Sequence, residues 1–431
     1  MGIARQGRMT RRRLVGSSVV AAAAPTLLAP AFAKRAGRAG AQEQITVRMT
    51  SPNASPAERA ALEATLAGFE ELNPGITIEY TPIPADYDTK LLADLAAGNA
   101  ADIFTSNEIA APDLVSRGVV QPIDDLMAAS GITLDQYYPG LVTPFSFDGQ
   151  QYGLPKDFST LAMVYDAEAL AEAGIEAGPT TWEELRAAAQ ALSDAGLPPL
   201  VFGPNFDRYL AFFYAAGARV VSEDGAAITV NSPEAVEAME FYYGMYRDGL
   251  AQSPTDVGAS WAGEAYAIEL ASMVFEGPWM FGALAETAPD RQFVVAPMPA
   301  GPAGQATVAF TGTYNLNAAT FADNPEVGQA AWEVVAYLVG AEGMATWTSA
   351  ARLLPSRPDL ADAFLAEFPE FEPFLAQGEV ALPFAFGPGG LNFNTNANGE
   401  IEALFAEQQD VQTTLDNLQG RAEETISVTG S

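Results

Sequence analysis

The stretch ITVRMTSPNASPAERAALEATLAGFEELNPGITIEY, residues 45–80, decides the fold. Residues 45–49 alternate between apolar and polar side chains, which predicts a strand. Residues 55–72 place their apolar side chains at helical spacing, which predicts an amphipathic helix. Asn-Pro-Gly at 73–75 ends that helix, and residues 76–80 resume the alternation of a strand. A strand, a helix and a second strand in this order form the repeating unit of parallel α/β sheets.

The same alternation of strands and helices continues along the chain. It predicts an α/β fold with mainly parallel sheets and helices on both faces. Residues 386–398, rich in Gly, Asn and Phe, are expected to form a loop. Further strands are expected at 102–105, 162–165, 200–203, 272–276 and 292–296, and further helices at 87–97, 110–117, 167–173, 206–216, 233–248, 326–339, 342–349 and 400–425, with one more capped by Thr180 or Thr181.

Composition excludes several classes of function. The 431 residues include no cysteine and no histidine, so disulfides, thiolate metal sites, thiol nucleophiles and imidazole bases are impossible. A metal ion would need oxygen ligands, and we expect neither a metal nor a cofactor. The net charge of −33 disfavours nucleic acid as a partner, because binding phosphates requires Lys and Arg.

Residues 1–33 are expected to be an export signal. A basic start is followed by an uncharged, Ala-rich stretch and by Ala-Phe-Ala at 31–33, a pattern typical of signal cleavage. Residues 10–15, TRRRLV, resemble a twin-arginine signal, and an ordinary Sec signal is the alternative. No cysteine follows, so we expect a protein without a lipid anchor, in a periplasm. No later stretch is long and apolar enough to span a membrane.

Ordered motifs place the chain near a known family. It resembles the extracellular solute-binding proteins of sugar ABC transporters, the group that contains maltose-binding protein. Each motif is weak alone, but their order and spacing together are specific. The motifs are FEELNPGIT (69–77), ADIF (101–104), GVVQPI (118–123), YGLP (152–155), TTWEEL (180–185), EGPW (276–279), APMP (296–299) and LPS (354–356).

The resemblance implies a two-lobed periplasmic-binding-protein fold with a ligand cleft between the lobes. The chain would cross between lobes near residues 152–157, 294–298 and 353–356. The lobes would close on the ligand about these crossings, as hinged binding proteins do. The first lobe would then comprise residues 34–155 and 295–353, and the second lobe residues 156–294 and 354–431.

Aromatic platforms and oriented polar groups are what a sugar receptor needs, because a sugar offers flat C–H faces and many hydroxyls. Trp279 follows Gly-Pro at a strand-to-helix turn, and the resemblance favours a place in the cleft over core packing. Trp261 lies in a Gly/Ser-flanked loop, where stacking on ligand and packing both explain it.

Asn107 and Glu108 end a strand at its carboxyl edge, where open α/β sheets bind ligands. Capping of the next helix is their alternative.

The remaining candidate ligand-binding residues have structural alternatives as well. Asn53 follows the first strand and would otherwise cap a helix. Asp157 follows a crossing strand and would otherwise pair with Lys156. Asp207 would otherwise complement a helix dipole, and Arg352 would otherwise be a structural partner. The other candidates, which open a helix or fill a turn in a returning segment, are Phe206, Thr313 and Tyr314.

The sequence therefore predicts a non-enzymatic receptor that captures a sugar or oligosaccharide and delivers it to the membrane subunits of an ABC importer. We expect a monomer. The main alternative is an exported glycoside hydrolase, which needs two carboxyl groups flanking the scissile bond. No local motif singles out such an acid and base pair. A polyol or a glycerol phosphodiester is an alternative ligand.

Overall fold

The computed structural model describes residues 44–52 and 56–428. The expected export signal at 1–33 and the candidate ligand residue Asn53 lie outside these residues. Within them, no helix combines the length and the apolar character that crossing a membrane requires.

The first sheet is built around the stretch that opens the fold. Its strands run in the order β13-β12-β3-β1-β2, and β6 also pairs with β12. β1 lies parallel to β2 and β3, whereas β12 lies antiparallel to β3 and β6, so the sheet is mixed. Its strands are β1 (Ile45–Thr50), β2 (Ile76–Tyr80), β3 (Ile103–Asn107), β6 (Pro155–Thr160), β12 (Thr307–Leu316) and β13 (Ala381–Pro383).

Helices cover this sheet because their apolar faces match its buried side chains. Val47 and Met49 of β1 are fully buried. They share a hydrophobic cluster with Leu66 and Phe69 of α1 (Pro56–Leu72) and with Trp332 of α13 (Pro325–Leu338). α14 (Ala341–Ala351) packs against both helices.

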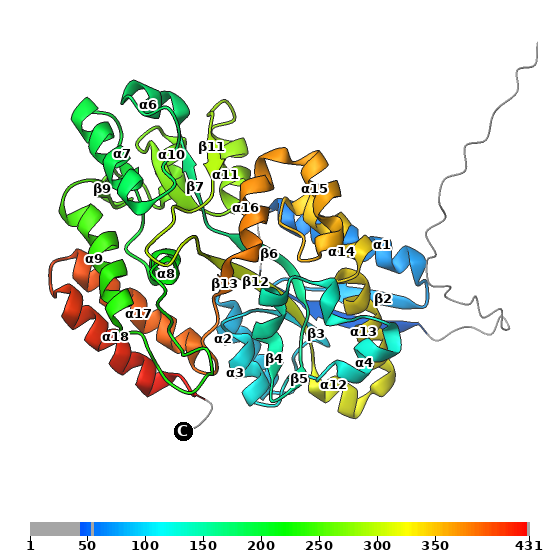
Figure 1. The fold of residues 1–431 in the computed structure, drawn as a ribbon. Helices are drawn as coiled ribbons and strands as arrows, with labels where there is room; N and C mark the ends of the chain where they lie inside the picture. The colour runs from blue at the N-terminus through cyan, green and yellow to red at the C-terminus, as the bar shows by residue number, and fades with distance from the viewer. Residues whose placement is uncertain (1–43, 53–55, 429–431) are drawn as a thin grey trace, which may run out of the picture. The chain divides into compact units, whose positions relative to one another are not determined.

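The second sheet has the order β11-β7-β10-β8-β9. β7 is antiparallel to both of its neighbours, whereas β10, β8 and β9 are parallel, so this sheet is mixed too. Its strands are β7 (Ala162–Tyr165), β8 (Leu200–Val201), β9 (Ala251–Gln252), β10 (Met273–Glu276) and β11 (Val294–Ala296). Figure 1 shows α7 (Trp182–Ala195) and α9 (Pro233–Arg247) on the same side of the picture as these strands.

The start of α7 follows the expected capping chemistry. Thr181, one of two expected caps, accepts a hydrogen bond from the backbone N–H of Glu184 at 3.2 Å, so α7 begins beside it. The remaining α-helices and strands are α2 (Tyr87–Ala96), α3 (Ala111–Ser116), α4 (Asp124–Ser130), α5 (Pro139–Val142), β4 (Ser146–Phe147), β5 (Gln150–Gln151), α6 (Ala167–Glu172), α8 (Phe206–Ala215), α10 (Ala262–Ala267), α11 (Trp279–Thr287), α12 (Ala318–Asp323), α15 (Ala361–Glu367), α16 (Glu372–Ala376), α17 (Gly390–Phe405) and α18 (Val411–Thr425).

The chain passes between the two sheets at short segments. β6 leads into β7 across the single residue Leu161, and β11 is followed by β12 after ten residues, 297–306. Residues 353–356 lie against β6, since the backbone N–H of Phe158 donates to the carbonyl of Leu354 at 3.0 Å. The passage at 297–306 overlaps the expected crossing at 294–298, whereas the first passage, at Leu161, lies after the expected 152–157. The third expected crossing and the lobe boundaries stay predictions.

Two expectations for the C-terminal region are wrong. Residues 386–398 are not one loop, because α17 begins at Gly390 and buries Phe393, Ala397 and Ile401 at helical spacing. Its Asn and Gly residues lower helix propensity, but tertiary packing outweighs that preference. The expected single helix at 400–425 is two helices. The break lies at 406–410, where Glu407 has a left-handed φ of 55°.

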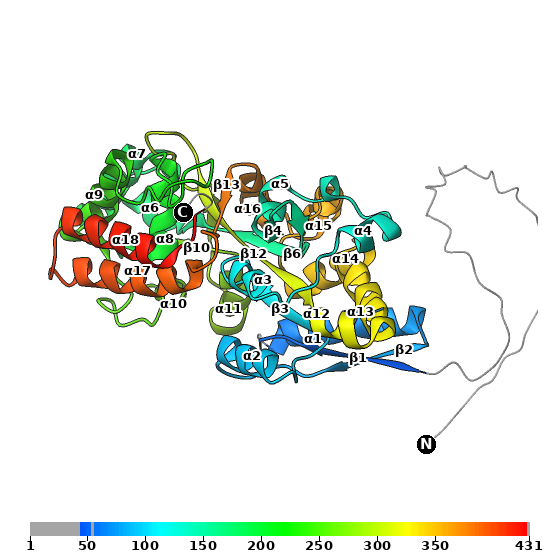
Figure 2. The same cartoon turned by 90° about the horizontal axis from the view of Figure 1, so that it is seen from below.

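β13 also departs from the expected division of the chain. It pairs with β12 in the first sheet, although it lies in the segment assigned to the second lobe. The chain then proceeds to α17 and α18, which pack beside α9; Figure 2 shows these three helices close together from a second direction. Residues 354–431 therefore supply a strand to the first sheet and two helices that pack beside α9.

Candidate functional site

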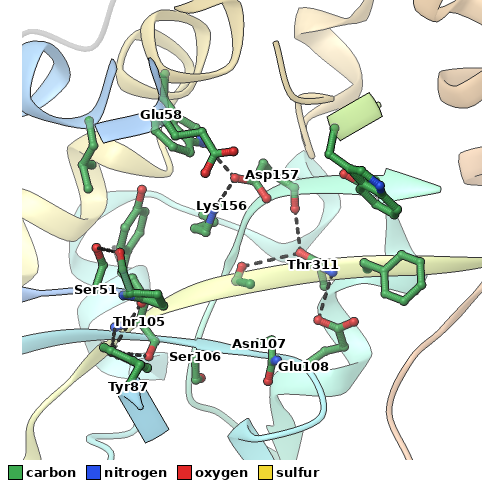
Figure 3. A pocket seen from close by; sticks show the side chains of 18 of the residues that line it. Ser51, Glu58, Tyr87, Thr105, Ser106, Asn107, Glu108, Lys156, Asp157 and Thr311 are labelled. Atoms are coloured by element: carbon green, nitrogen blue, oxygen red, sulfur yellow. Dashed lines mark hydrogen bonds and ion pairs between the residues drawn. The ribbon is translucent and has the colours of Figure 1, made fainter. Parts of the chain in front are cut away.

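A cavity of about 730 Å³ is lined by strands of the first sheet, by neighbouring helices and by α8 and α11, which pack on the second sheet. Its size falls within the range of small-molecule binding sites. Figure 3 shows polar side chains from several strands and helices around it. The lining residues are Ser51, Pro52, Glu58, Arg59, Leu62, Tyr80, Tyr87, Asp88, Thr105, Ser106, Asn107, Glu108, Lys156, Asp157, Ser159, Asp207, Trp279, Phe310, Thr311, Gly312, Tyr314, Trp347 and Phe384.

Glu108 is the most deeply buried carboxyl group of the cavity wall. Only 1% of the residue is exposed, and its Oε2 accepts a hydrogen bond from the backbone N–H of Thr311 at 2.9 Å. Burial raises the pKa of Glu108 to about 8, and the nearby Asp157 acts in the same direction. At neutral pH this group is therefore mainly a neutral acid that has a proton to donate.

Lys156 and Asp157 of β6 form a charged pair beside α14. The Lys156 ammonium contacts Asp157 Oδ2, and it also lies 5.0 Å from the ring centroid of Trp347. The indole Nε1 of Trp347 donates to the same Asp157 oxygen at 2.8 Å. Figure 3 shows the side chain of Glu58 pointing toward this pair. Burial raises the pKa of Glu58, although Lys156 opposes that rise.

Trp279 lies on the part of the cavity wall that α8 and α11 contribute. It is half-buried at the start of α11, and its Nε1 donates to Glu276 Oε2 at 2.9 Å. The Arg208 guanidinium lies 5.3 Å from its ring centroid. Arg208 in turn pairs with Asp207, which also lines the cavity. Phe310 of β12 approaches the same ring in an edge-on geometry at 5.9 Å.

Tyrosines line the wall that the first sheet contributes. The Tyr87 hydroxyl donates to the carbonyl of Thr105 at 2.8 Å and accepts from its backbone N–H. The Tyr80 hydroxyl lies 2.6 Å from Ser51 Oγ. Burial raises the pKa of Tyr80, Tyr87 and Tyr314 above 10, so all three hydroxyls remain neutral at physiological pH.

Several residues singled out from the sequence meet at this cavity. Asn107, Glu108, Asp157, Asp207, Trp279 and Tyr314 all line it. One structural alternative is also realised, because Asp157 pairs with Lys156. The Asn107 side chain accepts from the backbone N–H of Ala110 at 3.0 Å, but Ala110 is itself the N-cap of α3, so Asn107 does not cap that helix. A residue can make such a structural contact and still face the cavity, so the two roles are compatible.

The structure places four other candidates outside the cavity lining. Phe206 is fully buried in the core around the second sheet, and Thr313 is buried in β12. Trp261 is half-buried against the hydrophobic cluster that contains α10. Arg352 ends α14 in a left-handed conformation with its guanidinium 5.3 Å from the ring centroid of Phe368. A role in ligand binding for these residues, and for Asn53, stays a prediction.

Sequence reasoning missed other lining side chains. Trp347 lies on a helix whose periodicity indicated only core packing, and no local signal marks it as facing a cavity. Tyr80 is the last residue of β2. The carboxyl-edge rule that selected Asn107 would have selected it too. Among residues 44–52 and 56–428, no group of three or more acidic side chains is arranged to hold a metal ion.

Comparison with known proteins identifies the family. The family model of the bacterial extracellular solute-binding proteins matches residues 53–345. A binding protein of Brucella abortus (strain 2308) is 29% identical over 318 residues, which cover 72% of this chain and 75% of that protein.

Solved structures share the fold. The GacH receptor of Streptomyces glaucescens, studied unliganded and in complex with acarbose, has a TM-score of 0.78 at 21% identity, covering 88% of this chain and 98% of that one. The sugar-binding protein MalE of Xanthomonas citri also has a TM-score of 0.78, at 22% identity, covering 88% and 96%. These structures confirm the expected two-lobed α/β fold. The chain belongs to the family of bacterial extracellular solute-binding proteins.

Proposed function

We propose that this protein is the receptor of an ABC importer and that it binds a neutral carbohydrate in the cavity between the first sheet and helices α8 and α11. The family favours a receptor over a glycoside hydrolase, because its members are solute-binding proteins. Of the two structures compared, one is a receptor solved with acarbose and the other is named a sugar-binding protein. Delivery of the ligand to membrane subunits is part of this proposal.

The observation that carries the proposal is the pairing of aromatic rings with carboxyl groups on one cavity surface. Trp279, Trp347 and Tyr80 line the same space as Glu108 and Asp157. Flat rings suit the C–H faces of a sugar, and carboxyl groups accept or donate hydrogen bonds to its hydroxyls. A ligand that leaves these buried groups unpaired would bind poorly, which provides selectivity.

The charges of the lining favour a neutral ligand over an anionic one. Carboxyl groups of Glu58, Asp88, Asp157 and Asp207 face the same cavity as the cationic Lys156 and Arg59. Because Lys156 already pairs with Asp157 and Arg59 with Glu63, both cations are weak attractions for a phosphate. Juxtaposed like charges are an effective means of rejecting a ligand. A glycerol phosphodiester should therefore bind far less well than a sugar.

A thermal-shift panel followed by calorimetry tests the proposal. The panel contains glucose, maltose, maltotriose, maltotetraose, acarbose, glycerol and glycerophosphocholine. A ligand present at about 100 times its dissociation constant adds about 2.7 kcal/mol to the free energy of unfolding. We expect at least one carbohydrate to raise the melting temperature and glycerophosphocholine to leave it unchanged. The reverse pattern would contradict a carbohydrate receptor.

A pair of tryptophan variants links binding to this cavity. Both Trp279 and Trp261 are half-buried, but only Trp279 of the two lines the cavity. Trp279→Ala should lose most of the affinity for the carbohydrate selected by the panel. Trp261→Ala, the matched control, should keep that affinity even if its stability falls. Equal loss of affinity in both variants would place the binding site elsewhere.

A further inference from the structure

Trp279 is held by a buried acceptor at the end of β10. Glu276 is the last residue of that strand and only 2% exposed, and its Oε2 accepts the indole N–H at 2.9 Å. This hydrogen bond uses the single donor of the indole. Because the acceptor is fixed in the sheet, the bond restricts the torsions that would otherwise let the ring turn.

Arg208 of α8 fixes the same ring from a second direction. Its guanidinium carbon lies 5.3 Å from the ring centroid, a distance typical of a cation–π contact. The guanidinium also pairs with Glu276 at 2.9 Å and with Asp207 at 2.8 Å. One planar group therefore joins the indole, its acceptor and a carboxylate of the cavity wall.

The cluster combines one cation with two carboxyl groups, and most of it is buried. The Arg208 side chain is 14% exposed and that of Glu276 is 3% exposed. Burial opposes the charge on Arg208, but the attraction of Glu276 and Asp207 outweighs it and raises the pKa of Arg208. Burial also raises the pKa of Glu276, although Arg208 opposes that rise. Glu276 ends β10 of the second sheet, and Asp207 and Arg208 lie on α8.

We propose that Arg208 and Glu276 are positioning residues that fix the Trp279 ring, so that the ligand meets the surface of the ring and never its N–H. This inference rests on the proposed function and adds a specificity to it. The part of the ligand beside Trp279 must be a C–H face rather than a hydrogen-bond acceptor. Neither Arg208 nor Glu276 is among the residues that line the cavity, so their effect is exerted through Trp279.

The expected gain from this arrangement is modest. Immobilising one side chain with several rotamers on binding costs about 0.5–1.5 kcal/mol, and a ring that is already fixed avoids that cost. By the same relation, releasing the ring should weaken carbohydrate binding about two- to tenfold. Loss of the ring itself, in Trp279→Ala, should weaken binding more.

A double-mutant cycle separates positioning from direct contact. Binding of maltotriose, or of the panel carbohydrate with the largest thermal shift, is measured by calorimetry. The proteins are the parent, Glu276→Ala, Trp279→Phe and the double variant. Phenylalanine has no N–H, so Glu276→Ala should weaken binding in the parent and have no further effect in the Trp279→Phe protein. Glu276→Gln, which keeps an acceptor, should restore most of the affinity.

A spectroscopic measurement tests the positioning without any ligand. The Trp279 indole ¹⁵N–¹H resonance is assigned by its absence from the Trp279→Phe protein. Its hydrogen exchange should be slow in the parent and in Glu276→Gln, and at least tenfold faster in Glu276→Ala. If Glu276→Ala does not fold, the double variant Arg208→Met, Glu276→Leu removes both buried charges and the acceptor together, and the same result is expected.

The outcomes distinguish a failure of the proposed carbohydrate binding from a failure of the positioning role of Arg208 and Glu276. If no panel carbohydrate binds the parent but indole exchange responds as stated, the proposed function fails and the positioning of Trp279 stands. If carbohydrate binds but the effect of Glu276→Ala persists undiminished in the Trp279→Phe protein, the positioning role is overturned. Indole exchange that is equally fast in the parent and in Glu276→Ala would overturn it as well.

Discussion

The free energy of unfolding of the parent protein should decrease as the pH rises, because Glu108 then loses its proton. The variant Glu108→Gln should not show this decrease. In the folded protein burial raises the pKa of Glu108 from 4.5 to about 8, so the folded form keeps its proton over a range in which the unfolded chain has released it. The stabilisation from this proton is complete below pH 4.5. It declines as the pH rises and is lost above pH 8.

The size of the effect follows from the same pKa. Each tenfold difference in proton affinity corresponds to about 1.4 kcal/mol, so the rise from 4.5 to about 8 amounts to about 5 kcal/mol at most. Glutamine stays neutral throughout, and its carbonyl oxygen can still accept from the backbone N–H of Thr311. The variant should therefore gain stability relative to the parent, by several kcal/mol, between pH 5 and pH 8.

Urea unfolding of both proteins at half-unit steps from pH 5 to pH 8.5 measures this difference. Comparing the two proteins at each pH cancels the titration of all other groups. Carbohydrate affinity measured on the same samples should fall above pH 8 in the parent and not in the variant. A difference in unfolding free energy that does not change with pH would refute the reasoning, because Glu108 would then be ionised in the folded protein.

Three further predictions concern export, packing and closure. Replacing both Arg11 and Arg12 by Lys should stop export in cells if the twin-arginine route is used, whereas normal export would assign the signal to the Sec route. Gly153→Ala should destabilise the fold by about 1–3 kcal/mol in urea unfolding, because a Cβ there would lie 2.4 Å from the Thr313 hydroxyl; unchanged stability would contradict this close approach. Saturating carbohydrate should reduce the radius of gyration in small-angle scattering if the crossings act as hinges, and an unchanged radius would indicate a cleft that does not close.

Much of the fold could be predicted from the sequence because its signals are local. Alternating side chains marked β1, and a helical pattern ended by Asn-Pro-Gly marked α1. The failure at α17 has a physical cause: its Gly and Asn residues favour loops, and only the contacts of Phe393 and its neighbours with distant helices make the helix stable. The antiparallel pairing of β12 is also non-local and leaves no trace in a short window.

The candidate site could be predicted only in part, for the same reason. Asn107 and Glu108 were found because a strand end is a local feature that the topology places at a cavity. Trp279 follows Gly-Pro at a strand-to-helix turn and Trp261 follows Ala-Ser in a loop, and these neighbours alone do not show which of the two rings lines the cavity. Trp347 was missed because facing a cavity depends on how α14 lies against β6.

A crystal structure of the protein with the carbohydrate selected by the panel tests the central claim most directly. The account predicts density for the sugar in the cavity, with one C–H face against the ring of Trp279 and hydroxyl groups within hydrogen-bond distance of Glu108 and Asp157. Sugar density on another surface, with this cavity containing only solvent, would contradict it.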